Sequence, residues 1–251
     1  MRSRGLDAGV ALTVLCLAGT VQPVAAQAAD EAKRVRQASA VFAEIMSAPD
    51  SGIPAEILER AEAVAVFPSL IRAGFVVGGQ RGKGILSVRN RETGTWSEPA
   101  FLTMTGGSWG AQIGGEAIDL VLVVMNRRGA ESLMSSRFKI GGDASASAGP
   151  VGRSVEASTD AWMRAQLLSY SRSRGLFAGA AIDGSVVEPD RDANRAFYGY
   201  PYSTAEVIGM AATRTAVGTS GRPSRRRPKI AEPQALEEWR ETLSRYFSTG
   251  R

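Results

Sequence analysis

The sequence predicts an α+β protein in which a strongly bent, barrel-like antiparallel β-sheet is flanked by helices at both ends. Apolar residues recur with a helical period near both ends of the chain. Short apolar runs punctuated by glycine and proline fill the middle, a pattern that is typical of strands. The 251 residues include 28 glycines, which favours bulges and tight turns in a β-rich body.

The N-terminal helices are predicted from apolar spacing and from one proline. Residues 30–47 place an apolar stripe on one helix face. Pro54 suits the first position of a helix, so a second helix is expected to begin there and to include Ile57 and Leu58. The stripe of the first helix consists of Val35, Ala38, Phe42, Ile45 and Met46.

The middle of the chain predicts the sheet. A hairpin turn is expected at 91–94, and the fully apolar residues 120–125 predict a buried central strand. Residues 130–135 suit a short helix, and the small alternating residues 144–148 predict a strand in a tight space. Three further short apolar runs predict strands at 63–67, 74–77 and 84–88.

The C-terminal part predicts two helices separated by a linker. Ser203 and Glu206 have the spacing of a capping box, which opens the first helix. Residues 213–231 are rich in glycine, serine, arginine and proline and predict a basic linker. Residues 232–251 predict an amphipathic helix with an apolar face made of Leu236, Trp239, Leu243, Tyr246 and Phe247.

Residues 1–28 predict a secretory signal peptide. Two arginines precede an apolar stretch at 8–19, and cleavage is expected after Ala26 or Ala28. The alternative is an uncleaved N-terminal anchor. Cys16, the only cysteine, lies in this stretch without the residues of a lipoprotein signal before it, so the mature chain is expected to have no disulfide. We therefore expect a periplasmic or secreted protein.

The formal net charge of +5 is concentrated in the predicted linker. Such a basic run indicates either a solvated linker or a contact with anionic lipid, polymer or nucleic acid, and nucleic acid is not our expectation. The five cations of the run are Arg222, Arg225, Arg226, Arg227 and Lys229.

Patterns that point to catalysis are incomplete. Residues 106–110 match the Gly-x-Ser-x-Gly nucleophile pattern, but the chain contains no histidine to act as the base for Ser108. A serine–lysine pair is the alternative that remains to be tested. Residues 78–84 resemble a phosphate loop, yet Val77 and Gly84 occupy positions where that loop needs glycine and a hydroxyl residue.

Metal ligands are also scarce. Zinc sites usually need histidine or cysteine, and the acidic stretch 188–192 lacks the glycine and the final glutamate of an EF-hand loop. We therefore expect neither a cofactor nor a metal, and the sequence favours binding over catalysis.

Seven segments, in order and with matching spacing, resemble the SYLF-domain family. They are IPAEIL (53–58), IRAGF (71–75), GTWSEP (94–99), DLVL (119–122), GPVGR (149–153), SRSRGLFAG (171–179) and NRAFYG (194–199). The resemblance implies a lipid-binding domain, here over residues 29–212. It also implies phosphoinositide recognition in eukaryotic members, with actin as a partner of some of them. Neither ligand is expected of an exported protein of bacterial type.

The resemblance also implies which residues bind lipid. Some members use a basic amphipathic helix, whose counterpart here would carry Lys33, Arg34 and Arg36 beside Phe42. The alternative is that this helix packs its apolar stripe on the sheet. The further basic candidates, taken mostly from the matching segments, are Arg72, Lys83, Arg153, Arg172 and Arg174.

The function predicted is non-enzymatic, peripheral binding of anionic phospholipid at a membrane surface of the cell envelope. The alternative is a structural protein of the envelope that docks a protein partner. In that case the linker cations and the Trp239, Leu243 and Phe247 face would make the contact.

Overall fold

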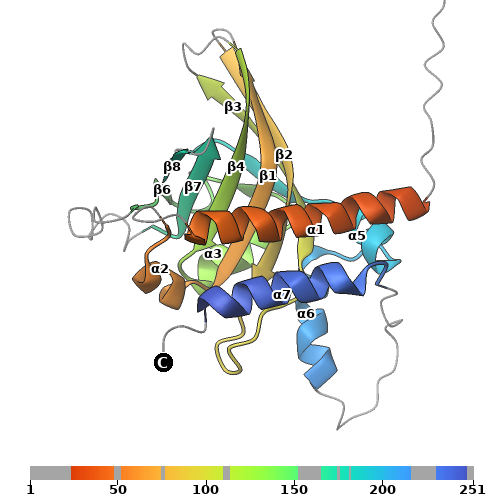
Figure 1. Cartoon of the computed structure of the whole chain (residues 1–251). Coiled ribbons are helices and arrows are strands. Elements are labelled where there is room, and N and C mark those ends of the chain that lie inside the picture. Colours follow the sequence, from red (N-terminus) through yellow and green to blue (C-terminus); the bar gives the residue numbers. More distant parts are fainter. Residues whose placement is uncertain are drawn as a thin grey trace, which may run out of the picture.

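A computed structural model of the chain describes residues 24–47, 52–74, 77–109, 114–151, 165–173, 176–180, 182–215 and 230–247. The predicted sites Arg153 and Arg174 lie outside these ranges, as do most of the predicted signal peptide and the cations of the linker. In the described residues the chain forms a curled sheet with most of its helices on one face, which confirms the predicted α+β class (Figure 1).

The first helix, α1 (Val24–Ser47), is longer than predicted and begins upstream of both expected cleavage positions. Cleavage after Ala28 would therefore shorten this helix at its N-terminus. The second helix, α2 (Ala55–Arg60), follows Pro54, which occupies the N-cap position. Both helices bury apolar residues in the main core, so the helical spacing in the sequence correctly identified their inner faces.

Nine strands form one sheet, in the order β5-β9-β3-β2-β1-β4-β7-β6, with β8 pairing β7. Neighbouring strands pair antiparallel except β6 and β7, which are parallel and make the sheet mixed. The strands are β1 (Ala63–Gly74), β2 (Val77–Val88), β3 (Ala100–Trp109), β4 (Gly114–Val124), β5 (Phe138–Lys139), β6 (Ala146–Ala148), β7 (Leu167–Ser173), β8 (Leu176–Gly179) and β9 (Val186–Pro189).

The central strands are about twice as long as the apolar runs that predicted them. β1 continues past Pro68 through an irregularity at Ser69, whose φ of 56° is unusual for a non-glycine residue. The Asp119 carboxylate accepts a hydrogen bond from the Ser69 N–H at 3.0 Å and holds this bend. The predicted single strand at 74–77 is wrong at its ends, because Gly74 ends β1 and Val77 begins β2; residues 75 and 76 lie outside the described residues. Glycine and proline therefore mark bends within this sheet as well as strand ends.

Small residues make room where the sheet is crowded, as the run at 144–148 suggested. A methyl group added to Gly149 would lie 2.1 Å from the Tyr170 ring. Only the last part of that run, β6, forms a strand, and it pairs with β7. The short helix near it, α3 (Arg127–Leu133), starts earlier than predicted because the Asn126 side chain caps it.

Two apolar clusters lie on opposite faces of the sheet. One face packs against α1, α2 and the C-terminal helices, while the other curls around a second cluster that includes residues of α3. The curl makes the sheet a half-barrel, in agreement with the predicted strong bend.

The C-terminal helices are α5 (Arg191–Tyr198), α6 (Thr204–Thr215) and α7 (Pro233–Phe247). The predicted capping box opens α6, since the Ser203 N–H donates to the Glu206 carboxylate at 2.9 Å. α7 lies alongside α1 across the sheet (Figure 1), and the Phe42 ring meets the Trp239 ring edge-on at 6.2 Å. The predicted C-terminal segment is therefore part of the same core.

Candidate functional site

Several segments that carry the family resemblance are buried and serve packing. In the GTWSEP segment, Gly94 has a left-handed φ of 69° and closes the turn before β3. Trp96 packs on Phe247 of α7, with ring centroids 4.5 Å apart. The Ser97 hydroxyl accepts a hydrogen bond from the Val88 N–H at 3.0 Å. This segment joins the β2–β3 connection to the C-terminal helix.

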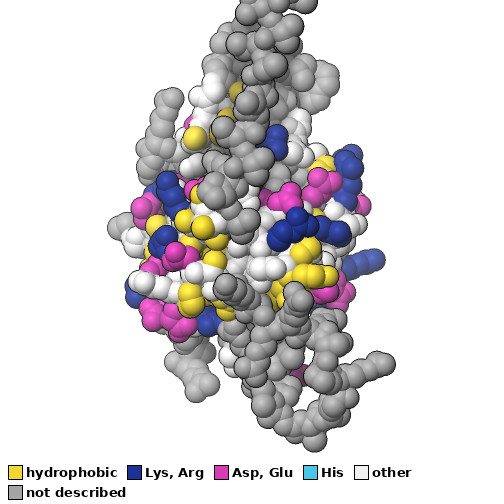
Figure 2. Space-filling view, turned by 90° about the vertical axis from the view of Figure 1, so that its right-hand side faces the viewer, with side chains coloured by type: hydrophobic (Ala, Val, Ile, Leu, Met, Phe, Trp, Pro, Cys, Tyr) yellow, Lys and Arg dark blue, Asp and Glu magenta, His cyan; other side chains and the backbone are white. Residues whose placement is uncertain are grey.

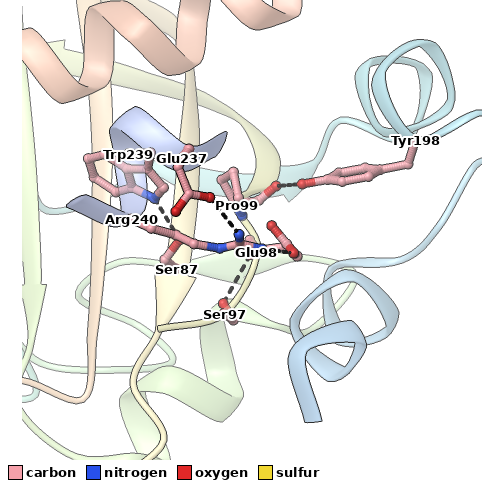
Figure 3. Close-up of polar contacts among 8 residues, drawn as sticks. All are labelled: Ser87, Ser97, Glu98, Pro99, Tyr198, Glu237, Trp239 and Arg240. Atoms are coloured by element: carbon pink, nitrogen blue, oxygen red, sulfur yellow. Dashed lines mark hydrogen bonds and ion pairs between the residues drawn. The ribbon is translucent and has the colours of Figure 1, made fainter. Parts of the chain in front are cut away.

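A polar network next to that segment holds α7 on the sheet (Figure 3). The Glu98 side chain is 1% exposed and forms an ion pair with Arg240, which also contacts Glu237 at 3.2 Å. The Trp239 indole N–H donates to the Ser87 hydroxyl at 2.8 Å. Buried polar groups contribute stability only when partnered, so this network ties α7 to β2 at one position.

The NRAFYG segment is buried in the same way. Asn194 accepts from the Phe101 N–H at 3.1 Å and donates to the Tyr202 carbonyl at 2.9 Å. The Tyr198 hydroxyl donates to the Pro99 carbonyl at 2.7 Å (Figure 3), and Gly199 ends α5 in a left-handed conformation. These contacts give the segment a structural role at the helix-covered end of the sheet.

The apolar face of α1 is covered in this structure. Phe42 is fully buried between rings of α7, at 6.2 Å from Trp239 and 5.8 Å from Phe247. The helix therefore packs its stripe on the sheet and on α7, which is the second of the two arrangements that the sequence allowed. Phe42 can meet a lipid only if α1 leaves the domain.

The predicted cations of α1 have different surroundings. The Arg34 guanidinium is largely buried, forms ion pairs with Glu31 at 2.6 Å and Asp190 at 3.5 Å, and lies 5.4 Å from the Phe101 ring centroid. Burial raises the pKa of Glu31, although Arg34 opposes this shift. Arg34 thus fixes α1 to α5 and β3.

The remaining cations of α1 are accessible. Arg36 is partly exposed and forms a long ion pair with Glu232 at 3.5 Å, while Lys33 is exposed. Lys33 and Arg36 are therefore accessible enough to contact a membrane surface.

The basic candidates of the strands are mostly engaged with other side chains. Lys83 is 52% exposed and contacts Asp190 at 3.2 Å. Arg172 bonds to Asp119 at 2.7 Å and to Glu44 of α1.

Arg72 lies on the opposite face of the sheet. Its guanidinium donates to the Gln80 side chain at 3.0 Å, and burial lowers its pKa. The predicted cations that the structure describes therefore do not gather into one site; Lys83 and Arg34 share Asp190, and the other described ones lie apart.

Beyond α1 the central strands continue without any of the described helices over them (Figure 1). In β2, the alternate residues Ile85, Lys83 and Arg81 share one face, and Ile85 is buried in the cluster that α1 covers. Farther along the same face of β1 to β4, each position with a described burial is exposed. We call this part the uncovered sheet face; it consists of Ile71, Ala73, Gly79, Arg81, Thr105, Gly107, Gly115 and Ala117.

One apolar side chain and one cation dominate the uncovered sheet face. Ile71 is 59% exposed and is the cross-strand partner of Arg81 in β2. No ion pair is recorded for Arg81 among the described residues. Leu176, which is 78% exposed, lies in the β7–β8 hairpin at the same end of the sheet. Two of the three large exposed apolar residues in the described ranges therefore share this end.

Sequence reasoning missed Ile71 and Arg81. Ile71 belongs to the IRAGF segment, but only its neighbour Arg72 was selected, because an apolar residue in a strand is normally expected in the core. The cross-strand pairing with Arg81 depends on the register, which the bend at Ser69 shifts. No local pattern in the sequence contains that register, so the pair follows only from the structure.

Other predicted sites have simple structural explanations. Ser108 lies within the extended strand β3 rather than on a strand-to-helix turn, and the loop-like run 78–84 is part of β2. Across the residues that the structure describes, acidic side chains do not cluster in a way that would hold a metal ion. In those same residues no helix is both long and apolar enough to cross a membrane.

The charged surface is mixed rather than uniformly basic. On the face shown in Figure 2, acidic and basic side chains lie next to one another. The exposed pair of Ile71 and Arg81 therefore marks a candidate binding surface better than the net positive charge does.

Comparison with known proteins identifies the relatives. Residues 105–243 match the family model Ysc84, described as "Las17-binding protein actin regulator". LAS seventeen-binding protein 3 of Saccharomyces cerevisiae is 39% identical over 153 residues, which cover 60% of this chain and 33% of the yeast protein. Human SH3 domain-containing YSC84-like protein 1 is 34% identical over 179 residues, covering 70% of this chain and 52% of the human protein.

The chain spans about a third to a half of the length of these relatives. Their names describe binding and regulation rather than an enzymatic reaction. Because the family model matches more than half of the residues, the resemblance seen in the sequence is confirmed. The chain belongs to the Ysc84, or SYLF-domain, family.

Proposed function

We propose that this protein binds the surface of anionic phospholipid membranes through the uncovered sheet face, without covalent chemistry. The observation that carries this proposal is the pairing of the exposed Ile71 with Arg81 at the end of the sheet that no helix covers. An apolar side chain that enters the headgroup boundary, with a cation beside it, is a sound physical basis for attachment to an anionic surface.

The shape of this face favours a close approach. The row next to Ile71 and Arg81 contains Ala73, Gly79, Gly107 and Gly115, so no side chain in that row is larger than a methyl group. Ile71 lies in the adjacent row and is 59% exposed, whereas Val186 of β9 in the same row is half-buried. In this proposal the small residues next to Ile71 let the membrane surface approach it.

Accessible cations elsewhere add to the attraction in this proposal. Each cation near an anionic membrane contributes about 1 kcal/mol, and the contribution falls with distance and salt. Lys33 and Arg36 on α1 are accessible, whereas Arg34 and Arg172 are engaged in ion pairs within the domain. In this proposal Arg34 and Arg172 hold α1 in place instead of binding lipid.

The compartment that we propose is the cell envelope, with the protein periplasmic or secreted and peripherally attached. This proposal rests on the signal peptide predicted for residues 1–28. Within the envelope the accessible ligand is an anionic glycerophospholipid.

The test is co-sedimentation of the protein with vesicles. Full-length protein is mixed with neutral phosphatidylcholine vesicles or with vesicles containing phosphatidylglycerol, at low and at physiological salt. We expect binding only to the anionic vesicles, and weaker binding at the higher salt. Arg81→Gln should lower the affinity about fivefold. Arg128→Gln, which changes an exposed arginine of α3, should bind like the wild type. Absence of binding to both vesicle types would refute the proposal.

A protein partner is the second candidate, favoured by the family description as Las17-binding actin regulators. The apolar face of α7 does not serve this role in the present conformation, because Trp239 and Leu243 are fully buried and Phe247 nearly so. Sedimentation with actin filaments, run beside the vesicle experiment, distinguishes the candidates. Binding to filaments but not to anionic vesicles would show that the protein binds a protein partner and not a membrane.

A further inference from the structure

A pocket of about 620 Å³ lies at the opposite end of β2 from Ile71 and Arg81. It opens between the β2–β3 connection, α3 and the start of α6. Its volume falls within the range of small-molecule sites. The wall combines the apolar residues Val88, Ala130, Met134 and Ile208 with Arg89 and Trp96.

Two hydrogen-bond donors at this pocket lack acceptors. Arg89 and Trp96 are cross-strand partners in an isolated antiparallel bridge, so their side chains lie on the same side of the hairpin. The Arg89 Nε and the Trp96 Nε1 are both buried and have no hydrogen-bond partner in the part of the chain that the structure describes. Trp96 as a whole is only 6% exposed. Buried donors are almost always satisfied, so two neighbouring orphans at a pocket point to an acceptor supplied from outside the chain.

The charges around the pocket leave Arg89 without a carboxylate partner. Arg91 contacts Glu62 at 3.0 Å and Arg127 contacts Glu131 at 2.9 Å, so these cations are neutralised locally. The terminal nitrogen of Arg89 reaches only the backbone carbonyl of Glu59, at a long 3.4 Å.

Glu92 also lines the pocket. It is exposed on the turn, and no ion pair is recorded for its carboxylate within the described ranges. Arg89, in contrast, is half-buried. The inner part of the pocket therefore has a cation that favours an anionic ligand.

We propose that this pocket binds a small amphipathic anion, in which an oxyanion head is joined to a short apolar chain. The head accepts hydrogen bonds from Arg89 and Trp96, and the chain lies against Val88, Met134 and Ile208. A guanidinium beside a second N–H donor is a recurrent arrangement for carboxylate and phosphate groups. The site is independent of the proposed membrane function, because it lies at the other end of the strands.

Calorimetric titration of the full-length protein with octanoate, octyl phosphate, inorganic phosphate and octanol tests this proposal. We expect saturable binding of octanoate or octyl phosphate, and at least tenfold weaker binding of octanol and inorganic phosphate. Arg89→Gln should weaken the binding at least tenfold, because it removes the cation from a largely desolvated head. Trp96→Phe keeps an aromatic ring but removes the N–H together with part of the indole, so it should weaken the binding about threefold to tenfold.

Arg128→Gln on the exposed part of α3 serves as the matched control and should bind like the wild type. Circular dichroism and the unfolding midpoint show whether each variant is folded, and Trp96→Phe provides a second test if Arg89→Gln is not. The proposal is overturned if the wild type binds neither amphipathic anion, since water would then satisfy the two donors. It is equally overturned if octanol binds as tightly as octanoate, or if folded Arg89→Gln binds like the wild type.

Discussion

The two ends of the central strands have the same backbone but different surroundings. At one end α1 and α7 cover the sheet and bury Phe42 and Trp239. At the other end the same face is open, and Ile71 lies exposed beside Arg81. Packing explains the family segments at the covered end, whereas it does not explain the exposed Ile71. The contrast separates residues that maintain the fold from residues that are left for binding.

The largest expected effect is at the covered end. Trp239→Ala removes a fully buried ring and its hydrogen bond to Ser87, which should lower the free energy of unfolding by about 3–5 kcal/mol. Urea denaturation followed by circular dichroism measures this. Trp239→Phe, which keeps an aromatic ring, should lower the free energy of unfolding much less. Equal stability of the alanine variant and the wild type would show that α7 does not dock as described.

The next effect concerns the network that holds α7. Arg240→Ala leaves the buried Glu98 carboxylate without its ion pair and should lower the free energy of unfolding by about 3 kcal/mol. Glu237→Ala removes only the exposed partner of Arg240 and should cost at most about 0.5 kcal/mol. Similar costs for the two variants in urea denaturation would contradict a special role for Glu98.

At the uncovered end we expect loss of binding without loss of stability. Ile71→Thr keeps a β-branched residue but removes about 1 kcal/mol of apolar transfer free energy, so vesicle affinity should fall roughly fivefold. The change in the free energy of unfolding should stay within about 0.5 kcal/mol. Tyr200→Ser alters another large exposed apolar residue, away from this face, and should leave vesicle binding unchanged. If both variants lose affinity equally, the uncovered face has no specific role.

The smallest effect is a pH dependence at the α1 contact. Burial raises the pKa of Glu31, so the folded state holds this proton more tightly than the unfolded state does. The contribution of Glu31 to stability is therefore present below its unfolded pKa and is lost as the pH rises through the raised value. Glu31→Gln should gain stability relative to the wild type between pH 4 and pH 7 in urea denaturation. A relative loss over that interval would show that the ion pair with Arg34 outweighs the burial.

Periodicity in the sequence was sufficient for much of the fold. The stripe with Val35 and Phe42 identified the buried face of α1, and the spacing of Ser203 and Glu206 identified the start of α6. Strand lengths could not be predicted from the apolar runs, because β1 passes through Pro68 by a local bend that depends on Asp119, fifty residues away.

The candidate site was harder to predict than the fold. The sequence identifies Arg34 and Arg172 as cations but not their partners, since Asp190 and Asp119 come from distant segments. The exposure of Ile71 depends on where α1 crosses the sheet, and no local pattern in β1 contains that information. The roles of Arg153 and Arg174 stay predictions, because both lie outside the described residues.

The most direct test of the difference between the two ends is a fluorescent label on each of them. With Cys16, the only cysteine, changed to serine, Ile71→Cys or Glu241→Cys provides one site for an environment-sensitive NBD label. Glu241 is exposed on α7 at the covered end and serves as the control. The proposed function predicts a blue shift and increased emission for the label at position 71 on phosphatidylglycerol vesicles, and no change at position 241. A shift at position 241 alone, or at neither position while the protein sediments with the vesicles, would contradict membrane binding through the uncovered sheet face.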